Sequence, residues 1–244
     1  MRNIWVIAEK EYKHYFISPI AYAVAFAVLL FLGVILYVNI LAASIQMYAP
    51  TIQIVLNPLS TLLLFMAPAI TMRALAEEQK TGTLEILLTA PVRDWEVVVG
   101  KWLGSILFLI TLLALTLPFA ILLNSLISPG IDQGLMAAGY LGIFLLGAAF
   151  LAIGVMTSSF FSNPIAAFYA TLGILLVLWV IGFPTEVMSQ SAGVEILRFL
   201  DMGMHFYSTF LVGVIDLKDI VYFLSVIALA LFIGTVSVET RRWR

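Results

Sequence analysis

The stretch of sequence that decides the fold covers residues 20–41 and reads IAYAVAFAVLLFLGVILYVNIL. It contains no Asp, Glu, Lys or Arg, and apolar side chains fill almost every position. An α-helix needs about 20 predominantly apolar residues to cross the roughly 30 Å hydrocarbon core of a bilayer. Residues 20–41 are therefore expected to form a membrane-spanning helix.

Outward from this stretch, the charged residues are separated by long intervals that contain no charge. These intervals lie between Lys13 and Arg73, between Lys101 and Asp132, between Asp132 and Glu186, and between Asp219 and Glu239. The first and third are each long enough for two crossings, and turn signals at Pro50 and Pro164 divide them. Six spans are expected, at residues 20–41, 54–74, 97–123, 134–158, 164–184 and 217–238.

The composition of the 244-residue chain indicates the same class of protein. Hydrophobic residues make up 63% and charged residues only 11%, which leaves too little polar surface to cover a soluble core. The chain has no cysteine, so disulfides, thiolate metal sites and cysteine nucleophiles are excluded. A formal net charge of −2 provides no basic field to hold nucleic acid. We expect a single all-α, polytopic membrane domain over residues 1–244.

The distribution of basic residues predicts the orientation in the membrane. Short loops rich in Lys and Arg stay on the cytoplasmic side. All Lys and Arg residues except Arg198 and Lys218 lie at the termini or in the loop after residues 54–74, so both termini are expected in the cytoplasm. Residues 3–17 place aromatic and charged side chains on opposite helical faces, as in a helix lying along the inner leaflet. This helix serves either as a plain anchor or as an elbow that clamps a partner.

The expected spans lack the side chains that membrane chemistry requires. Ion-driven carriers, proton pumps and haem proteins place ionisable or ligating groups at bilayer depth, and the centres of these spans hold none. His14 and His205 fall on opposite sides of the membrane and are expected as solvated surface histidines. Asp201 and His205 form the only candidate catalytic pair of the outer loop, and helix capping or surface hydrogen bonding explains them better. The one Gly-Lys pair precedes Trp102 and lacks the earlier glycine of a P-loop, so no enzyme activity, cofactor or metal site is expected.

The loop after residues 54–74 reads RALAEEQKTGTLEILLTAPVRDWEVVVGK over residues 73–101. Glu77, Glu78 and Lys80 form a polar run closing the second expected span, and Gly82 permits a sharp turn. Residues 83–89 then form a short predicted helix that Pro91 ends. Its apolar stripe consists of Leu84, Leu87 and Leu88. Because an isolated helix this short is unstable in water, the stripe is expected to dock into a groove on another protein.

This loop resembles that of a known family, the ABC-2 permeases, which are membrane subunits of exporter-type ABC transporters. The matching positions are Glu77, Glu78, Gly82, Thr83, Glu85, Leu87, Leu88, Pro91, Gly100 and Lys101. The resemblance implies that residues 83–89 form a coupling helix on a separate ATPase subunit, which binds ATP and Mg²⁺. It further implies two ATPase copies, a second permease copy or a paralogous permease, and location in the inner membrane of a bacterial cell.

The resemblance extends over the whole chain and implies an N-terminal elbow helix, six spans and short outer helices between spans five and six. Residues 194–214 suit the outer helices, because they are apolar yet too charged to cross a bilayer. The C-terminal third resembles the gliding-motility permease subgroup. An accessory extracytoplasmic protein is a further candidate partner. Members of the family move many kinds of substrate, so the resemblance does not identify the cargo.

Two smaller groups of residues are candidates for the translocation path and for helix packing. Phe65, Met66, Phe168 and Tyr169 are candidates to line an apolar path, although lipid-facing or core positions are more common for such residues. Gly134, Ala138 and Gly142 recur every four residues and allow another helix to approach closely. They serve either packing inside the bundle or an interface with a second subunit. Pro58 and Pro68 are candidate flex points of the second span.

Three other functions compete with ATP-driven export. A non-transport scaffold would anchor an ATPase or a larger complex without moving a substrate. A channel or passive facilitator would need a polar pore lining, and the spans offer only scattered Ser, Thr and Asn. A membrane enzyme would need facing catalytic side chains at the interface. The loop pattern favours the transporter permease.

Overall fold

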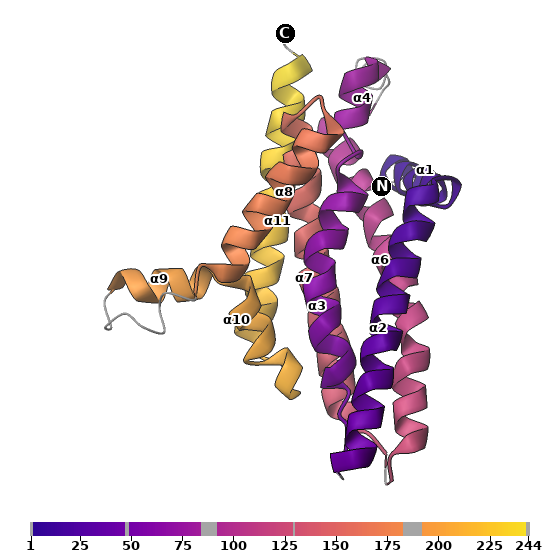
Figure 1. Cartoon of the computed structure of the whole chain (residues 1–244). Coiled ribbons are helices and arrows are strands. Elements are labelled where there is room, and N and C mark those ends of the chain that lie inside the picture. Colours follow the sequence, from indigo (N-terminus) through magenta and orange to yellow (C-terminus); the bar gives the residue numbers. More distant parts are fainter. Residues whose placement is uncertain (1, 47–48, 84–91, 129, 183–191, 243–244) are drawn as a thin grey trace.

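The computed structural model describes residues 2–46, 49–83, 92–128, 130–182 and 192–242, and every regular element within these ranges is a helix. The long helices run side by side and form a bundle (Figure 1). They are α2 (Pro19–Gln46), α3 (Gln53–Thr71), α6 (Asp94–Leu126), α7 (Gln133–Phe160), α8 (Pro164–Val180) and α11 (Leu217–Arg242). The all-α prediction is thereby confirmed for the described residues.

Shorter helices flank this bundle. Helices α1 (Arg2–Ile17) and α4 (Ala76–Thr81) lie at the end where the N- and C-termini are found (Figure 1). Toward the other end are α9 (Ala192–Leu200), α10 (Met202–Tyr207) and the 3₁₀ helix η2 (Phe210–Val212). Figure 1 shows α1 nearly end-on beside the upright α2, so the chain turns sharply at Pro19. Helix α9 projects sideways from the bundle.

Five helices among the described residues are long and apolar enough to cross a membrane. They correspond to the expected spans at residues 20–41, 54–74, 97–123, 134–158 and 217–238. The expected span at residues 164–184 corresponds to α8, an apolar helix of 17 residues. Part of that expected range, residues 183–184, lies outside the described residues. The sixth crossing therefore stays a prediction.

The second expected span ends earlier in the structure than in the prediction. Helix α3 stops at Thr71, and the polar run that includes Glu77 and Glu78 lies on the separate helix α4. The chain bends between the two helices because the Ser158 hydroxyl of α7 accepts hydrogen bonds from the backbone N–H groups of Leu75 and Ala76, both at 3.0 Å. A contact with a distant residue thus replaces the helical pattern at this point.

Helix α7 is the centre of the bundle and packs against α3, α6, α8 and α11. Its middle turns are fully buried, with Leu146, Ala149, Phe150 and Leu151 all at 0% exposure. Ala138 and Gly142 of the expected small-residue stripe are also buried, whereas Gly134 is exposed at the helix start. Gly142 faces Phe210 of η2, which comes so close that an added Cβ would clash with the Phe210 ring. This residue therefore serves packing inside the chain.

The outer helices are held to α11 by a buried histidine, which corrects one expectation. His205 is only 6% exposed, while His14 is exposed as expected. The His205 Nδ1 atom lies 2.6 Å from Asp219 Oδ1, and Nε2 lies 2.9 Å from the carbonyl oxygen of Phe199. The expectation of a solvated His205 was wrong because α10 places this ring against α11, where it also stacks on Tyr222 with ring centroids 3.9 Å apart.

Asp201 plays the capping role that was expected of it. Its carboxylate accepts the backbone N–H of Met204 at 3.0 Å at the start of α10. The catalytic alternative for Asp201 and His205 loses its basis, since the His205 ring nitrogens contact Asp219 and the Phe199 carbonyl instead.

We expect Gly142→Ala to destabilise the protein, because the new Cβ overpacks the contact with Phe210. Overpacking of this kind costs about 1–3 kcal/mol, which a thermal unfolding curve of the detergent-purified chain would register as a lower midpoint. Gly173→Ala is the matched control, because no heavy atom lies within 4 Å of a Cβ added at that position. Equal midpoints for the two variants would contradict the packing role of Gly142.

We expect His205→Leu to destabilise the protein by about 3–5 kcal/mol, because it leaves the buried Asp219 carboxylate without its partner. The double variant His205→Leu/Asp219→Leu should recover much of that loss, since it removes both polar groups. His14→Leu, at an exposed position, should leave the unfolding midpoint unchanged. A double variant no more stable than the single one would show that the pair is not the source of the effect.

Candidate functional site

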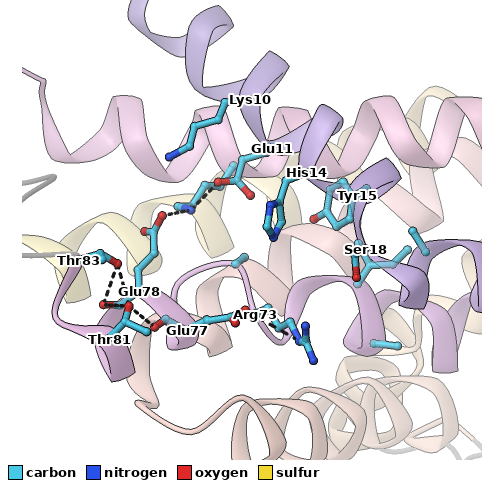
Figure 2. Close-up of a pocket in the computed structure, with 15 residues that line it drawn as sticks. Lys10, Glu11, His14, Tyr15, Ser18, Arg73, Glu77, Glu78, Thr81 and Thr83 are labelled. Atoms are coloured by element: carbon cyan, nitrogen blue, oxygen red, sulfur yellow. Dashed lines mark hydrogen bonds and ion pairs between the residues drawn. The ribbon is translucent and has the colours of Figure 1, made fainter.

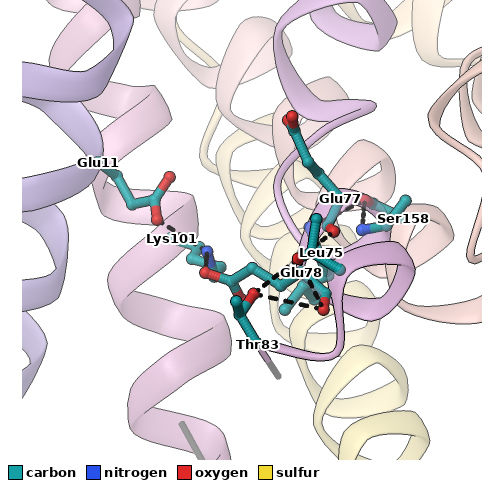
Figure 3. Close-up of polar contacts among 9 residues, drawn as sticks. Glu11, Leu75, Glu77, Glu78, Thr83, Lys101 and Ser158 are labelled. Atoms are coloured by element: carbon teal, nitrogen blue, oxygen red, sulfur yellow. Dashed lines mark hydrogen bonds and ion pairs between the residues drawn. The ribbon is translucent and has the colours of Figure 1, made fainter. Parts of the chain in front are cut away.

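A buried lysine lies where three helices meet at the end of the bundle near both termini. Lys101 of α6 has a side chain that is 3% exposed. Its ammonium group lies 2.7 Å from Glu11 Oε1 of α1 and 2.8 Å from Glu78 Oε1 of α4 (Figure 3). One buried cation thus connects the N-terminal helix and the helix that precedes the predicted coupling segment. We call these three residues the Lys101 triad.

The triad depends on the close approach of α1 to α6. A Cβ added at Gly100 would lie 2.8 Å from the side chain of Ile7, and one added at Gly104 would lie 3.1 Å from the carbonyl oxygen of Ala8. Ala8 itself is completely buried. Because Gly100 and Gly104 present no side chain, α1 lies directly on this face of α6. This close contact between the two helices brings the Glu11 carboxylate within reach of Lys101.

Further polar contacts fix α1 along α6. Asn3 donates a hydrogen bond to Glu96 Oε2 at 3.2 Å, and the Tyr12 hydroxyl lies 2.9 Å from that of Thr111. Tyr15 is held near the triad, and burial together with the Glu11 carboxylate raises the pKa of its phenol. Helix α1 is thus held to α6 by polar contacts near its start and in its middle, in addition to apolar contact.

Helix α4 is anchored on its other side to the end of α7. In addition to the two hydrogen bonds that Ser158 accepts from the start of α4, Gln79 donates to the carbonyl oxygen of Ser159 at 2.8 Å. Arg73 Nε lies 3.9 Å from Glu77 Oε2, a pair that is about half exposed. Helix α4 thus contacts α6 through Glu78 and α7 through its backbone and Gln79.

The segment expected to form the coupling helix begins directly after these contacts. Gly82 ends α4 with φ of 73°, a backbone conformation that favours glycine and agrees with the expected turn. Thr83 is described, and its hydroxyl lies 2.9 Å from that of Thr81. The remaining predicted coupling residues lie outside the described residues; they are Leu84, Glu85, Leu87, Leu88 and Pro91. The coupling helix therefore stays a prediction.

The start of α6 is held by a hydrogen bond of its own. The backbone N–H of Arg93 donates to Glu96 Oε2 at 3.0 Å at the start of α6. Lys101 follows on the same helix, so both sides of residues 84–91 are connected to the triad.

The residues proposed for a translocation path lie on α3 and α8, which pack against each other. Met66 is buried at 3% exposure, whereas Phe65 is 50% and Tyr169 67% exposed. The rings of Phe168 and Tyr169 contact edge to face, with centroids 5.4 Å apart. Because Met66 belongs to the core and Phe65 to the surface, these side chains do not line one common face. Their role in transport stays a prediction.

Glu78 and Lys101 were predicted as site residues from the family resemblance, whereas their pairing with Glu11 was not predicted. A signal was present, since Lys101 lies inside an expected span and a charge at that depth needs a partner. The spacing of Gly100 and Gly104 also indicated a close helix contact on α6. Within the described ranges, no three His, Asp or Glu side chains gather as metal ligands.

A comparison with protein-family models matched residues 5–242 to a model described as an ABC-2 family transporter protein. A search of curated proteins gave no match. The family match covers nearly the whole chain and includes every described helix that contributes to the triad. Family members are multi-pass membrane subunits that work with a separate ABC ATPase. The chain therefore belongs to the ABC-2 transporter family.

Proposed function

We propose that this chain is the permease subunit of an exporter-type ABC transporter and that the Lys101 triad transmits motion from the ATPase to the membrane helices. The observation that supports the proposal most directly is the buried ammonium of Lys101 between Glu11 and Glu78. It connects three helices, two of which flank residues 84–91 along the chain, and the ATPase is expected to dock on those residues.

The contacts of α4 suggest how a displacement would spread. Helix α4 has only six residues, so a displacement of residues 84–91 would be passed to it with little bending. From α4, the ion pair between Glu78 and Lys101 leads to α6, and the hydrogen bonds with Ser158 and Ser159 lead to α7. Glu11 carries the same displacement to α1. Two long helices and the N-terminal helix would then move together.

The energetics of burial also support a role beyond stability. Moving ions from water into a protein interior is unfavourable, and well-packed apolar residues often stabilise a fold as well as a buried ion pair does. A buried charged triad is thus expected to stabilise the fold no better than apolar residues at the same positions would. It does hold Glu11 and Glu78 to one defined geometry, which a link between moving parts needs.

The proposed assembly follows the ABC-2 family pattern. It contains two ATPase copies, which bind ATP and Mg²⁺, and a second copy of this chain or a paralogous permease. The membrane domain has six spans, with α8 as the fifth, both termini in the cytoplasm and α1 as the elbow helix. An accessory extracytoplasmic protein would dock on the side of the outer helices. The bacterial inner membrane and the gliding-motility subgroup are part of the same proposal.

The triad can be tested by separating its charge from its contribution to folding. Lys101→Met alone should destabilise the chain by about 3–5 kcal/mol, since two carboxylates lose their partner. The triple variant Lys101→Met/Glu11→Leu/Glu78→Leu should unfold near the wild-type midpoint. Its permease-dependent ATP hydrolysis should fall about fivefold or more. A fivefold change is the lower end of what typical coupling free energies produce.

The control for the triple variant is Glu9→Gln/Lys13→Gln, which removes an exposed ion pair of 2.6 Å on the same helix. This control should retain both stability and ATP hydrolysis, because exposed pairs contribute little. A triple variant that folds, binds the ATPase and hydrolyses ATP at the wild-type rate would show that the triad has no part in coupling.

The scaffold alternative is distinguished by Glu85→Arg in the predicted coupling segment. If the chain is a transporter permease, the variant should still co-purify with the ABC ATPase encoded beside it. The complex should nevertheless lose permease-dependent ATP hydrolysis. If the chain is a scaffold, the variant should either abolish assembly of the complex or have no effect. Glu195→Arg, an equal change of charge at an exposed position on α9, is the control and should leave both measurements unchanged.

A further inference from the structure

A cavity of about 210 Å³ lies beside the triad, between the N-terminal helix and the end of α3 (Figure 2). Its lining comes from α1, the start of α2, the end of α3, α4 and Lys101 of α6. In Figure 2, Lys10 and His14 lie on one side, and Arg73 and Glu77 lie on the facing side. The cavity is at the end of the long apolar helices that lies near both termini.

Three hydrogen-bond donors of this cavity lack a close partner. The side chains of Lys10 and His14 make no hydrogen bond or ion pair with any other described residue. Arg73 comes no closer than 3.9 Å to Glu77, and both side chains are about half exposed. These donors face one another from α1 and from the bend after α3. An acceptor group placed between them would be contacted from both sides.

The other part of the lining is apolar. Ala21 comes from the first turn of α2, and Ala69 and Ile70 come from the last turn of α3. Both turns continue into long helices of the bundle, whereas Arg73 and Glu77 lie beyond the end of α3. The cavity is therefore amphipathic, with its apolar part on the long helices of the bundle and its donors on α1 and beyond the end of α3.

The charges of the lining restrict the ligand further. Lys10, Arg73 and Lys101 are balanced by Glu11, Glu77 and Glu78, with Lys101 already paired to two of the acids. A balanced lining does not attract a polyanion such as a nucleotide. It suits one phosphate diester beside a positive group, which is the headgroup of a zwitterionic phospholipid. Arginine binds phosphate well, because its planar donors match the phosphate oxygens.

We propose that this cavity binds the phosphodiester of a membrane glycerophospholipid of the phosphatidylethanolamine type. Arg73, Lys10 and His14 donate to the phosphate, and the acyl chains start along Ala21 and Ile70. Glu77 lies within reach of the amine of the headgroup. The site requires only that this end of the bundle meets a bilayer surface, so it does not depend on coupling to an ATPase.

The test is native mass spectrometry of the full chain in detergent, titrated with phosphatidylethanolamine. The wild-type chain should retain one lipid, and Arg73→Gln should weaken that binding about tenfold, because a hydrogen bond to a charged group is lost. Arg73→Lys should retain part of the affinity. Lys13→Gln is the matched control, since Lys13 is exposed, pairs with Glu9 and does not line the cavity. Equal affinities for Arg73→Gln and Lys13→Gln would overturn the proposal.

Two further ligands identify the source of the phosphate. Diacylglycerol with the same chains lacks the phosphate and should bind at least about tenfold more weakly. Glycerol 3-phosphate lacks the chains and should also bind weakly. Glycerol 3-phosphate that binds as tightly as the lipid would overturn the lipid assignment and indicate a site for soluble phosphate esters.

A second variant and a measurement of unfolding distinguish loss of the lipid site from misfolding. Ala69→Phe fills the apolar part of the cavity without changing a charge, and it should abolish retention of the lipid. Thermal unfolding of each variant shows whether the fold is intact. A folded Ala69→Phe that retains the lipid like the wild type would overturn the proposal, whatever the result for Arg73→Gln.

Discussion

The burial of one positive charge organises the end of the bundle where both termini lie. An ammonium group removed from water needs compensating anions, and Lys101 at 3% exposure obtains two carboxylates from two different helices. Neither carboxylate reaches it unless α1 lies flat on the glycine face of α6 and α4 bends back against α7. The charge thereby determines the positions of α1 and α4. The polar contacts of Ser158 and Gln79 satisfy the backbone around that arrangement.

Small residues allow close contacts between helices at several places in the described bundle. Gly100 and Gly104 do so on α6, and Gly142 does so where η2 packs on α7. In a membrane, where lipid tails are as apolar as leucine, close backbone approach and hydrogen bonds drive helix association. The two buried polar clusters, around Lys101 and around His205, lie toward opposite ends of the bundle. Between them the core is mainly apolar, with Phe150 and Leu146 completely buried.

Much of the fold was predictable, because hydropathy and charge are local properties. The charge-free intervals located the long helices, and the basic residues grouped the ends of the chain that lie near each other in Figure 1. The pairing of Glu11 with Lys101 was not predictable, since the partners are 90 residues apart and the contact depends on the approach of two helices. His205 was misjudged for the same reason. Its charged and polar neighbours suggested solvent, whereas its burial comes from a return of the chain onto α11.

The same separation along the chain has a consequence for biogenesis. Helix α1 is synthesised first, but the glycine face on which it rests arrives only with α6, after two long apolar helices have been made. During that interval the Glu11 carboxylate is without its ammonium partner. Helix α1 can therefore dock only after α6 has been made. Its docking requires that the glycine face of α6 is correctly placed.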